Sequence, residues 1–162
     1  MKRHPVLAIL VLIVILALCG AAAAEEKVLR LSTLAPLTTV DPHSTVNIQD
    51  KMVIFQVFEP LVRQNEGTGE YEPRVAESYT ISDDGLLYTF KIRKNAKFHN
   101  GEDVKASDVV FSLKRAAANP KMRSWLVIME DAVEADEYTV EVKLRQPNAA
   151  FLNNQSVVMI IS

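Results

Sequence analysis

The feature of this sequence that most restricts its fold is a regular alternation of apolar and polar residues between positions 86 and 93. In an extended chain, one face of this run carries the apolar side chains Leu86, Tyr88, Phe90 and Ile92. Another extended run over residues 78–82 precedes it, and Asp83-Asp84-Gly85 lies between the two as a turn, with glycine supplying a positive φ angle. The segment therefore predicts an antiparallel β-hairpin with one buried face.

The rest of the chain after residue 26 predicts further strands mixed with short helices, and hence an α+β fold. Strands are expected over residues 27–33, 61–64, 130–135 and 138–144, and helices over residues 46–58, 107–118 and 148–154. The helix over 46–58 has apolar residues at spacings of three and four, which predicts that Ile48 and Met52 face a core. Ser44 or Thr45 is expected to cap this helix.

Residues 1–24 differ from the rest of the chain because they contain no acidic residue. A basic head, Lys2 and Arg3, is followed by 14 residues without a polar group, and small residues then lead to Ala24 and Glu25. This order is typical of a secretory signal peptide, so we expect cleavage between Ala24 and Glu25. Export would place the mature chain in the periplasm or on the outer face of the cytoplasmic membrane.

Two alternatives for the first segment remain open. Retention as a membrane anchor is one, although the uncharged stretch of 19 residues from Val6 to Ala24 is near the lower limit for a membrane span. Lipidation of Cys19 is the other, although Leu18 is larger than the residue that normally precedes a lipidated cysteine.

The mature chain offers little chemistry for catalysis. Cleavage after Ala24 removes two of 18 basic residues, leaving 16 against 20 acidic residues, and also removes the only cysteine. His43 and His99 have no partner at metal-ligand spacing, and most carboxylates lie in turns or on solvent faces. The basic residues are fewer than the acidic ones, so the sequence gives no sign of a basic surface for nucleic acid. We therefore expect a binding protein without a metal or a cofactor, and not an enzyme.

Eight segments in sequence order resemble the bacterial extracellular solute-binding proteins of family 5, which are the dipeptide, oligopeptide and nickel-binding components of ABC importers. The segments are residues 39–43, 58–62, 73–78, 82–85, 88–93, 98–101, 106–115 and 147–152, which together span nearly all of the mature chain. One departure is Lys105, where the family usually has Ser or Thr as a helix cap. Ser107 or Asp103 is therefore expected to cap the following helix, which would start later or fray.

The resemblance implies the N-terminal part of a two-lobed, type II-like periplasmic-binding-protein fold with antiparallel hairpins and short helices. Residues 25–62 would begin lobe I, and residues 63–162 would form an incomplete satellite domain of that lobe. Lobe II would be absent, because family members run to several hundred residues. The apolar run over 157–161 also predicts a fragment, since it has the pattern of a buried strand with no turn after it. Its open edge predicts that the fragment alone is poorly soluble or free of ligand.

The function that the resemblance implies is capture of a solute, most simply a peptide, by a monomer that delivers it to an ABC permease. By position, Thr45, Val46, Asn47 and Ile48 are implied as one ligand wall, and Trp125 as the opposing wall. The alternative is structural, with Val46, Ile48 and Trp125 as ordinary core residues. Two other classes compete: an envelope-anchored interaction protein without a transport role, and a secreted hydrolase that would need a nucleophile beside a histidine.

Overall fold

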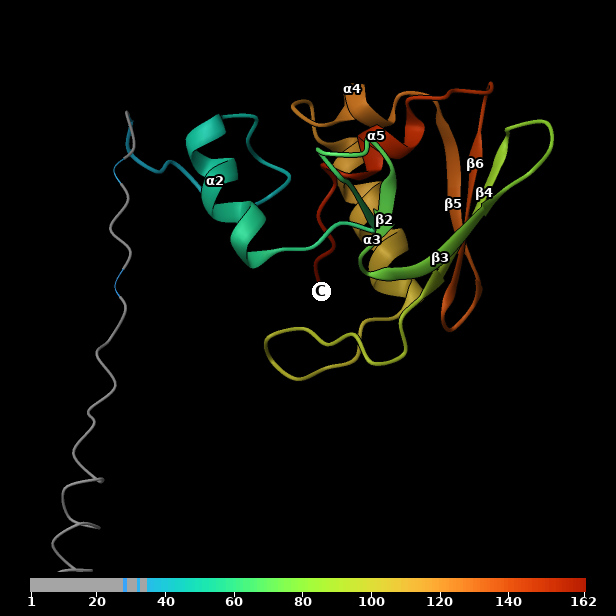
Figure 1. Ribbon diagram of the computed structural model, residues 1–162, viewed down its shortest axis with the longest axis horizontal. Coiled ribbons are helices and arrows are strands. Elements are labelled where there is room, and N and C mark those ends of the chain that lie inside the picture. The colour runs from blue at the N-terminus through green and yellow to red at the C-terminus, as the bar shows by residue number, and fades with distance from the viewer. Residues whose placement is uncertain (1–27, 29–31, 33–34) are drawn as a thin grey trace, which may run out of the picture. The chain divides into compact units, whose positions relative to one another are not determined.

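The computed structural model describes residues 28, 32 and 35–162 (Figure 1). The expected signal peptide over residues 1–24, Cys19, the cleavage site at Ala24 and Glu25, and nearly all of the strand expected over residues 27–33 lie outside the described residues. The described elements are α2 (Ile48–Val57), β1 (Val62–Gln64), β2 (Tyr71–Pro73), β3 (Ala76–Ile81), β4 (Leu87–Ile92), α3 (Ala106–Ala118), α4 (Arg123–Leu126), β5 (Met129–Asp136), β6 (Thr139–Leu144) and α5 (Phe151–Gln155). The helices in this part of the chain are all too short or too polar to span a membrane.

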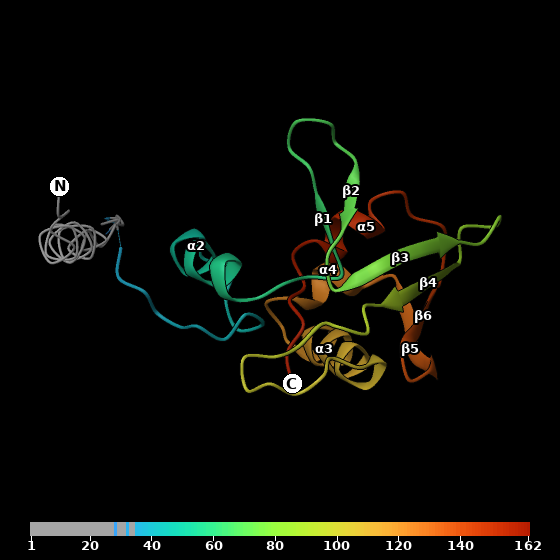
Figure 2. The same cartoon turned by 60° about the horizontal axis from the view of Figure 1, so that its bottom comes forward.

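Both predicted hairpins are confirmed, and they join in one four-stranded antiparallel sheet in the order β3-β4-β6-β5 (Figures 1 and 2). Tyr79 of β3 lies opposite Phe90 of β4, and the turn between these strands places Gly85 at a φ angle of 69°. The second hairpin attaches through β6, which pairs with β4. Strands β1 and β2 form a separate two-stranded sheet.

The core lies between this sheet and α3, as the alternating pattern predicts. The buried apolar side chains of the two central strands are Tyr88, Phe90, Ile92, Val140, Val142 and Leu144. Val109, Leu113 and Ala116 of α3 are fully buried in the same cluster. Burial of each large apolar side chain stabilises the fold by about 1.5–3 kcal/mol, so this contact accounts for much of the stability of the unit.

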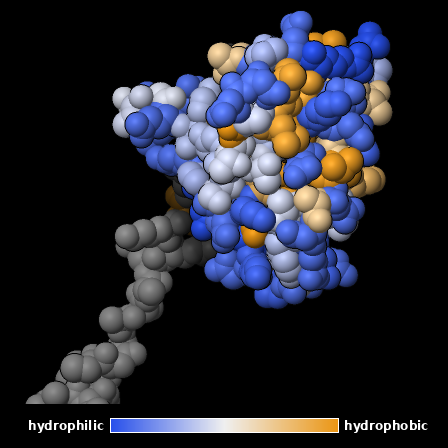
Figure 3. Space-filling model, turned by 90° about the vertical axis from the view of Figure 1, so that its right-hand side faces the viewer, coloured by the Kyte–Doolittle hydropathy of each residue, from blue (hydrophilic) through white to orange (hydrophobic). Residues whose placement is uncertain are grey.

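The alternate positions of the central strands are mostly polar and less buried. Thr89 of β4 lies opposite Glu141 of β6, and Leu87 lies opposite Lys143, and none of these four residues is buried. Figure 3 shows the side of the molecule on which β5 and β6 lie, where hydrophobic residues form separate patches between hydrophilic ones. The sheet therefore has one face against the core and one face toward solvent.

The start of α3 differs from the prediction. The helix begins at Ala106 with Lys105 in the capping position, and neither Ser107 nor Asp103 acts as its cap. Asp108 accepts a hydrogen bond of 2.9 Å from the backbone N–H of Lys105, which closes the first turn from inside the helix. An acidic residue in the first turn also interacts favourably with the helix dipole, so the helix does not start later.

The C-terminal run is covered, and the predicted open edge over residues 157–161 is wrong for this structure. Val158, Met159 and Ile160 are at most 5% exposed. The run is also not a strand, since it forms a single bridge between Met159 and Pro60 and one further bond from Ile160 N–H to the Glu59 carbonyl. Proline has no N–H to donate, which prevents a longer ladder at this position.

Helix α2 exists, but the predicted core face of this helix is wrong. Ile48 is 70% exposed and Met52 is 47% exposed, whereas Asp50 and Ile54 are the buried residues of α2. Apolar residues occur on several sides of this helix, so their spacing does not define one face. The hydrogen bonds of Asp50, described below, decide which side turns inward.

Candidate functional site

The loop before α2 is held from one side by the buried carboxylate of Asp50. This carboxylate accepts hydrogen bonds from the backbone N–H of Thr38 at 2.8 Å, the Thr38 hydroxyl at 2.6 Å and the Thr45 hydroxyl at 2.7 Å. These donors, with Thr38 first, hold the pKa of Asp50 below its usual range. The Thr45 hydroxyl also accepts from the backbone N–H of Asn47, so Thr45 supports the helix start from outside the capping position.

The same loop is held from the other side by an ion pair between Asp41 and Arg115 of α3. Both terminal guanidinium nitrogens, Nη1 and Nη2, donate to the carboxylate, at 2.9 and 2.6 Å, and the Ser44 hydroxyl donates to it at 2.7 Å. The hydrogen bonds from Arg115 hold the pKa of Asp41 well below its usual range. A two-point pair of this kind fixes orientation as well as distance, so it positions the loop on α3.

His43 forms a third attachment of this loop. Its side chain is fully buried, and its Nε2 lies 2.9 Å from the backbone carbonyl of Met159, near the other end of the chain. A carbonyl can only accept, so Nε2 carries the proton and donates. Burial lowers the pKa of His43, which favours the neutral ring. His43 therefore has a structural role, and it does not serve only its own turn.

These attachments leave three of the four predicted wall residues at the surface. Val46 is 52% exposed and Ile48 is 70% exposed, and Asn47 is also exposed. The alternative that Val46 and Ile48 belong to the helix core is therefore wrong for this structure. Thr45 is 2% exposed and its hydroxyl is bonded within the protein, so it supports this surface without being part of it.

Trp125 on α4 lies beside α2 through a contact that the sequence did not reveal. The ammonium nitrogen of Lys51 is 5.5 Å from the centroid of the Trp125 ring, a cation–π geometry. Trp125 itself is half-buried and packs on the core cluster. We define the α2–Trp125 surface by five residues: Val46, Asn47, Ile48, Lys51 and Trp125. Lys51 links the residues that were predicted for opposing walls, so we treat them as one surface.

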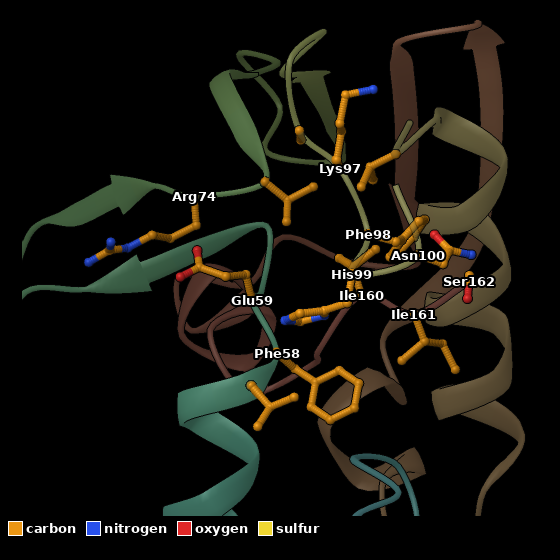
Figure 4. Close-up of a pocket in the computed structure, with 14 residues that line it drawn as sticks. Phe58, Glu59, Arg74, Lys97, Phe98, His99, Asn100, Ile160, Ile161 and Ser162 are labelled. Carbon is orange, nitrogen blue, oxygen red and sulfur yellow. The ribbon is translucent and has the colours of Figure 1, made fainter. Parts of the chain in front are cut away.

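A separate cavity of about 470 Å³ lies at the other end of α2 (Figure 4). Its walls come from the end of α2, the loop before α3 and the C-terminal segment, and include Phe58, Phe98, His99, Ile160 and Ile161. This volume is within the range of small-molecule sites. None of the five predicted wall residues lines the cavity, whereas His99, which the sequence did not single out as a binding residue, does.

The chemistry of these two places is that of binding. Among residues 28, 32 and 35–162 there is no group of three or more His, Cys, Asp or Glu side chains placed to hold a metal ion. The α2–Trp125 surface offers exposed apolar side chains, an amide, an indole ring and one ammonium group. Such a set can bind a solute by apolar contact and hydrogen bonding.

Comparison with known proteins agrees with the motifs in the sequence. Residues 70–161, more than half of the chain, match the middle part of the bacterial extracellular solute-binding proteins, family 5. The chain is 35% identical over 142 residues to the glutathione-binding protein GsiB of Escherichia coli O1:K1 / APEC, which covers 86% of this chain and 27% of that protein. The chain thus spans about a quarter of the length of this relative.

Solved structures share the fold. MoaA from A. tumefaciens R10 in complex with mannopinic acid has a TM-score of 0.70 and 30% identity, and the match covers 77% of this chain and 27% of that one. DppA from Helicobacter pylori in complex with the peptide STSA has a TM-score of 0.66 and 28% identity, over 79% of this chain and 29% of that one.

These likenesses confirm the predicted fold class, an α+β part of a type II periplasmic-binding-protein fold. The family is one of solute-binding proteins, which agrees with the expectation that the chain is not an enzyme. The chain belongs to the bacterial extracellular solute-binding proteins of family 5.

Proposed function

We propose that this chain is the first part of the solute-binding component of an ABC importer, and that the complete component captures peptides for a membrane permease. The observation that carries the proposal is the family match over residues 70–161. The complete component acts as a monomer whose two lobes close around the solute. Closure is a shift between open and closed populations, driven by solute contacts with both lobes.

Peptides are the proposed solutes because one similar protein is named for a peptide and the solved structure of another contains one. GsiB is a glutathione-binding protein, glutathione being a tripeptide, and the DppA structure holds the peptide STSA. MoaA holds mannopinic acid, so family membership alone does not select the solute. The α2–Trp125 surface would form part of one wall, with Val46, Asn47 and Ile48 on one side and Trp125 on the other.

The proposed domain plan follows from the share of the relatives that the chain covers. Residues 25–62 begin lobe I, and residues 63–162 form part of its satellite domain. The chain covers 27% of GsiB, and the missing length leaves room for the rest of lobe I and for lobe II. The satellite domain, in this plan, is the unit built on the sheet β3-β4-β6-β5.

Calorimetric titration of the mature product of the full reading frame with trialanine and glutathione tests this function. Binding of either peptide supports it, and absence of binding by both overturns the peptide assignment. Ile48→Asp is expected to weaken binding by about tenfold or more, because a charge would enter an apolar contact. Val133→Asp is the matched control, since Val133 is an exposed apolar residue of β5, 43% exposed, and should leave the affinity unchanged.

Export is proposed through cleavage after Ala24, which releases a free protein into the periplasm. The alternative is an envelope-anchored interaction protein without a transport role. Intact mass measurement of the mature protein separates the two. A chain that starts at Glu25 excludes an anchor, whereas a lipid-shifted mass starting at Cys19 excludes free residence in the periplasm.

A further inference from the structure

Lys51 is a partly buried cation without an acidic partner among the described residues. Its side chain is half-buried, and its one recorded side-chain contact is the face of Trp125 at 5.5 Å. The neighbouring carboxylate of Asp50 instead accepts three hydrogen bonds from Thr38 and Thr45. Burial lowers the pKa of Lys51, as expected for a cation that has lost water without gaining an anion.

Most other lysines among the described residues form an ion pair or a hydrogen bond with an oxygen atom. Five form ion pairs with acidic side chains: Lys91, Lys97, Lys105, Lys114 and Lys143. Lys121 donates to the Ser44 carbonyl at 2.7 Å. Lys94 resembles Lys51 in lying over an aromatic ring, that of Tyr138 at 5.7 Å, but Lys94 is exposed. Lys51 is therefore the lysine in this set that combines partial burial with the lack of an anion.

The position of Lys51 places this cation at the proposed solute wall. Lys51 lies one helical turn after Asn47, to whose carbonyl its own backbone N–H donates at 3.1 Å. Ile48 precedes it by three residues, so both neighbours share its side of α2. Its ammonium group lies over Trp125, which comes from a segment more than 70 residues later. A solute on this surface would meet the charge and the ring together.

We propose that Lys51 binds a carboxylate of the solute beside the Trp125 ring, and that the protein therefore selects anionic solutes. This inference rests on the proposed solute-binding function and adds the charge class of the solute. An ammonium group that is partly removed from water binds a carboxylate more strongly than an exposed one does, because the local dielectric is lower. The carboxylate would supply the partner that Lys51 lacks.

The first test compares trialanine with its C-terminal amide by calorimetry, on the mature product of the full reading frame. The wild type is expected to prefer the carboxylate by about tenfold or more, the usual size of a charge-assisted hydrogen bond. Lys51→Gln should abolish this preference, and Lys51→Arg should retain part of it. Lys94→Gln is the matched control and should keep the full preference. The inference is overturned if the wild type binds trialanine and Lys51→Gln does not change the preference for trialanine over its amide. The proposed function stands in that case.

A second test does not depend on peptides. The rate of Lys51 acetylation by a water-soluble ester is followed by mass spectrometry in the presence of glutarate or its diamide. Glutarate is expected to slow acetylation of Lys51 severalfold and to leave Lys94 unchanged, while the diamide protects neither. If peptides do not bind but glutarate protects Lys51, the peptide assignment fails and the carboxylate site stands. If peptides do not bind and glutarate gives no protection, both proposals are overturned.

Discussion

The loop before α2 is held by residue contacts that local sequence does not reveal. The backbone N–H of His43 donates to Asp41 within the same loop. The ring of His43, however, donates to the backbone carbonyl of Met159, which is 116 residues away in sequence. Arg115 pairs with Asp41 across 74 residues. The topology brings these groups together, and no short motif specifies such long-range contacts.

Replacing Asp41 with Asn tests the ion pair with Arg115. Because the pKa of Asp41 is depressed in the folded state, the pair contributes stability above about pH 4, and this contribution is lost as the pH falls further. We expect Asp41→Asn to lower the free energy of unfolding by about 1 kcal/mol at pH 7 and by less at pH 3. Urea denaturation of the mature chain at both pH values measures this. Asp83→Asn in the exposed hairpin turn is the control, and an equal effect of both changes would contradict the role of the pair.

Replacing His43 with Gln tests the buried imidazole. Burial lowers the pKa of His43 below 6.5, so the unfolded chain binds a proton more readily, and stability falls as the pH decreases from 6.5. The slope is expected to be at most about 1.4 kcal/mol per pH unit for one group. His43→Gln should remove this slope between pH 7 and 5, whereas His99→Gln should retain it. If His99→Gln removes the pH dependence of the unfolding free energy and His43→Gln retains it, the effect has been assigned to the wrong histidine.

Among the helices and strands, the sequence predicts the buried face correctly only where the apolar residues recur on one side. The hairpins β3–β4 and β5–β6 and the helix α3 have one clear apolar face, and all three are confirmed. Helix α2 has apolar residues on several sides, so its orientation depends on the hydrogen bonds of Asp50 and could not be predicted. The C-terminal run is apolar enough for a strand, but its neighbour Pro60 cannot extend a ladder.

Phe90 and Thr89, neighbours on opposite faces of β4, test the alternation that predicted the hairpin. Phe90 is 0% exposed, and truncation of a buried phenylalanine leaves a cavity. Phe90→Ala is expected to lower the free energy of unfolding by about 3–5 kcal/mol. Thr89→Ala, on the solvent side, should cost less than about 1 kcal/mol. Chemical denaturation followed by circular dichroism measures both, and similar losses would mean that the sheet is not buried on one face only.

In the whole molecule, this chain is proposed to supply one wall of a binding site. The α2–Trp125 surface is open, and Ile48, Met52 and Val57 on α2 remain 46–70% exposed within the described chain. The relative GsiB is much longer than this chain, which covers 27% of it. Sequence motifs could predict the family. They could not predict the contact between Lys51 and Trp125, because that contact requires the fold.

The central claim is that this chain contributes one wall of a site that a second lobe completes. The most direct measurement is calorimetry with trialanine on two proteins under the same conditions, residues 25–162 alone and the mature product of the full reading frame. We expect binding by the full product and no measurable heat from residues 25–162, because solute contacts with only one wall cannot offset the entropy lost on association. Tight binding of trialanine by residues 25–162 alone would contradict it.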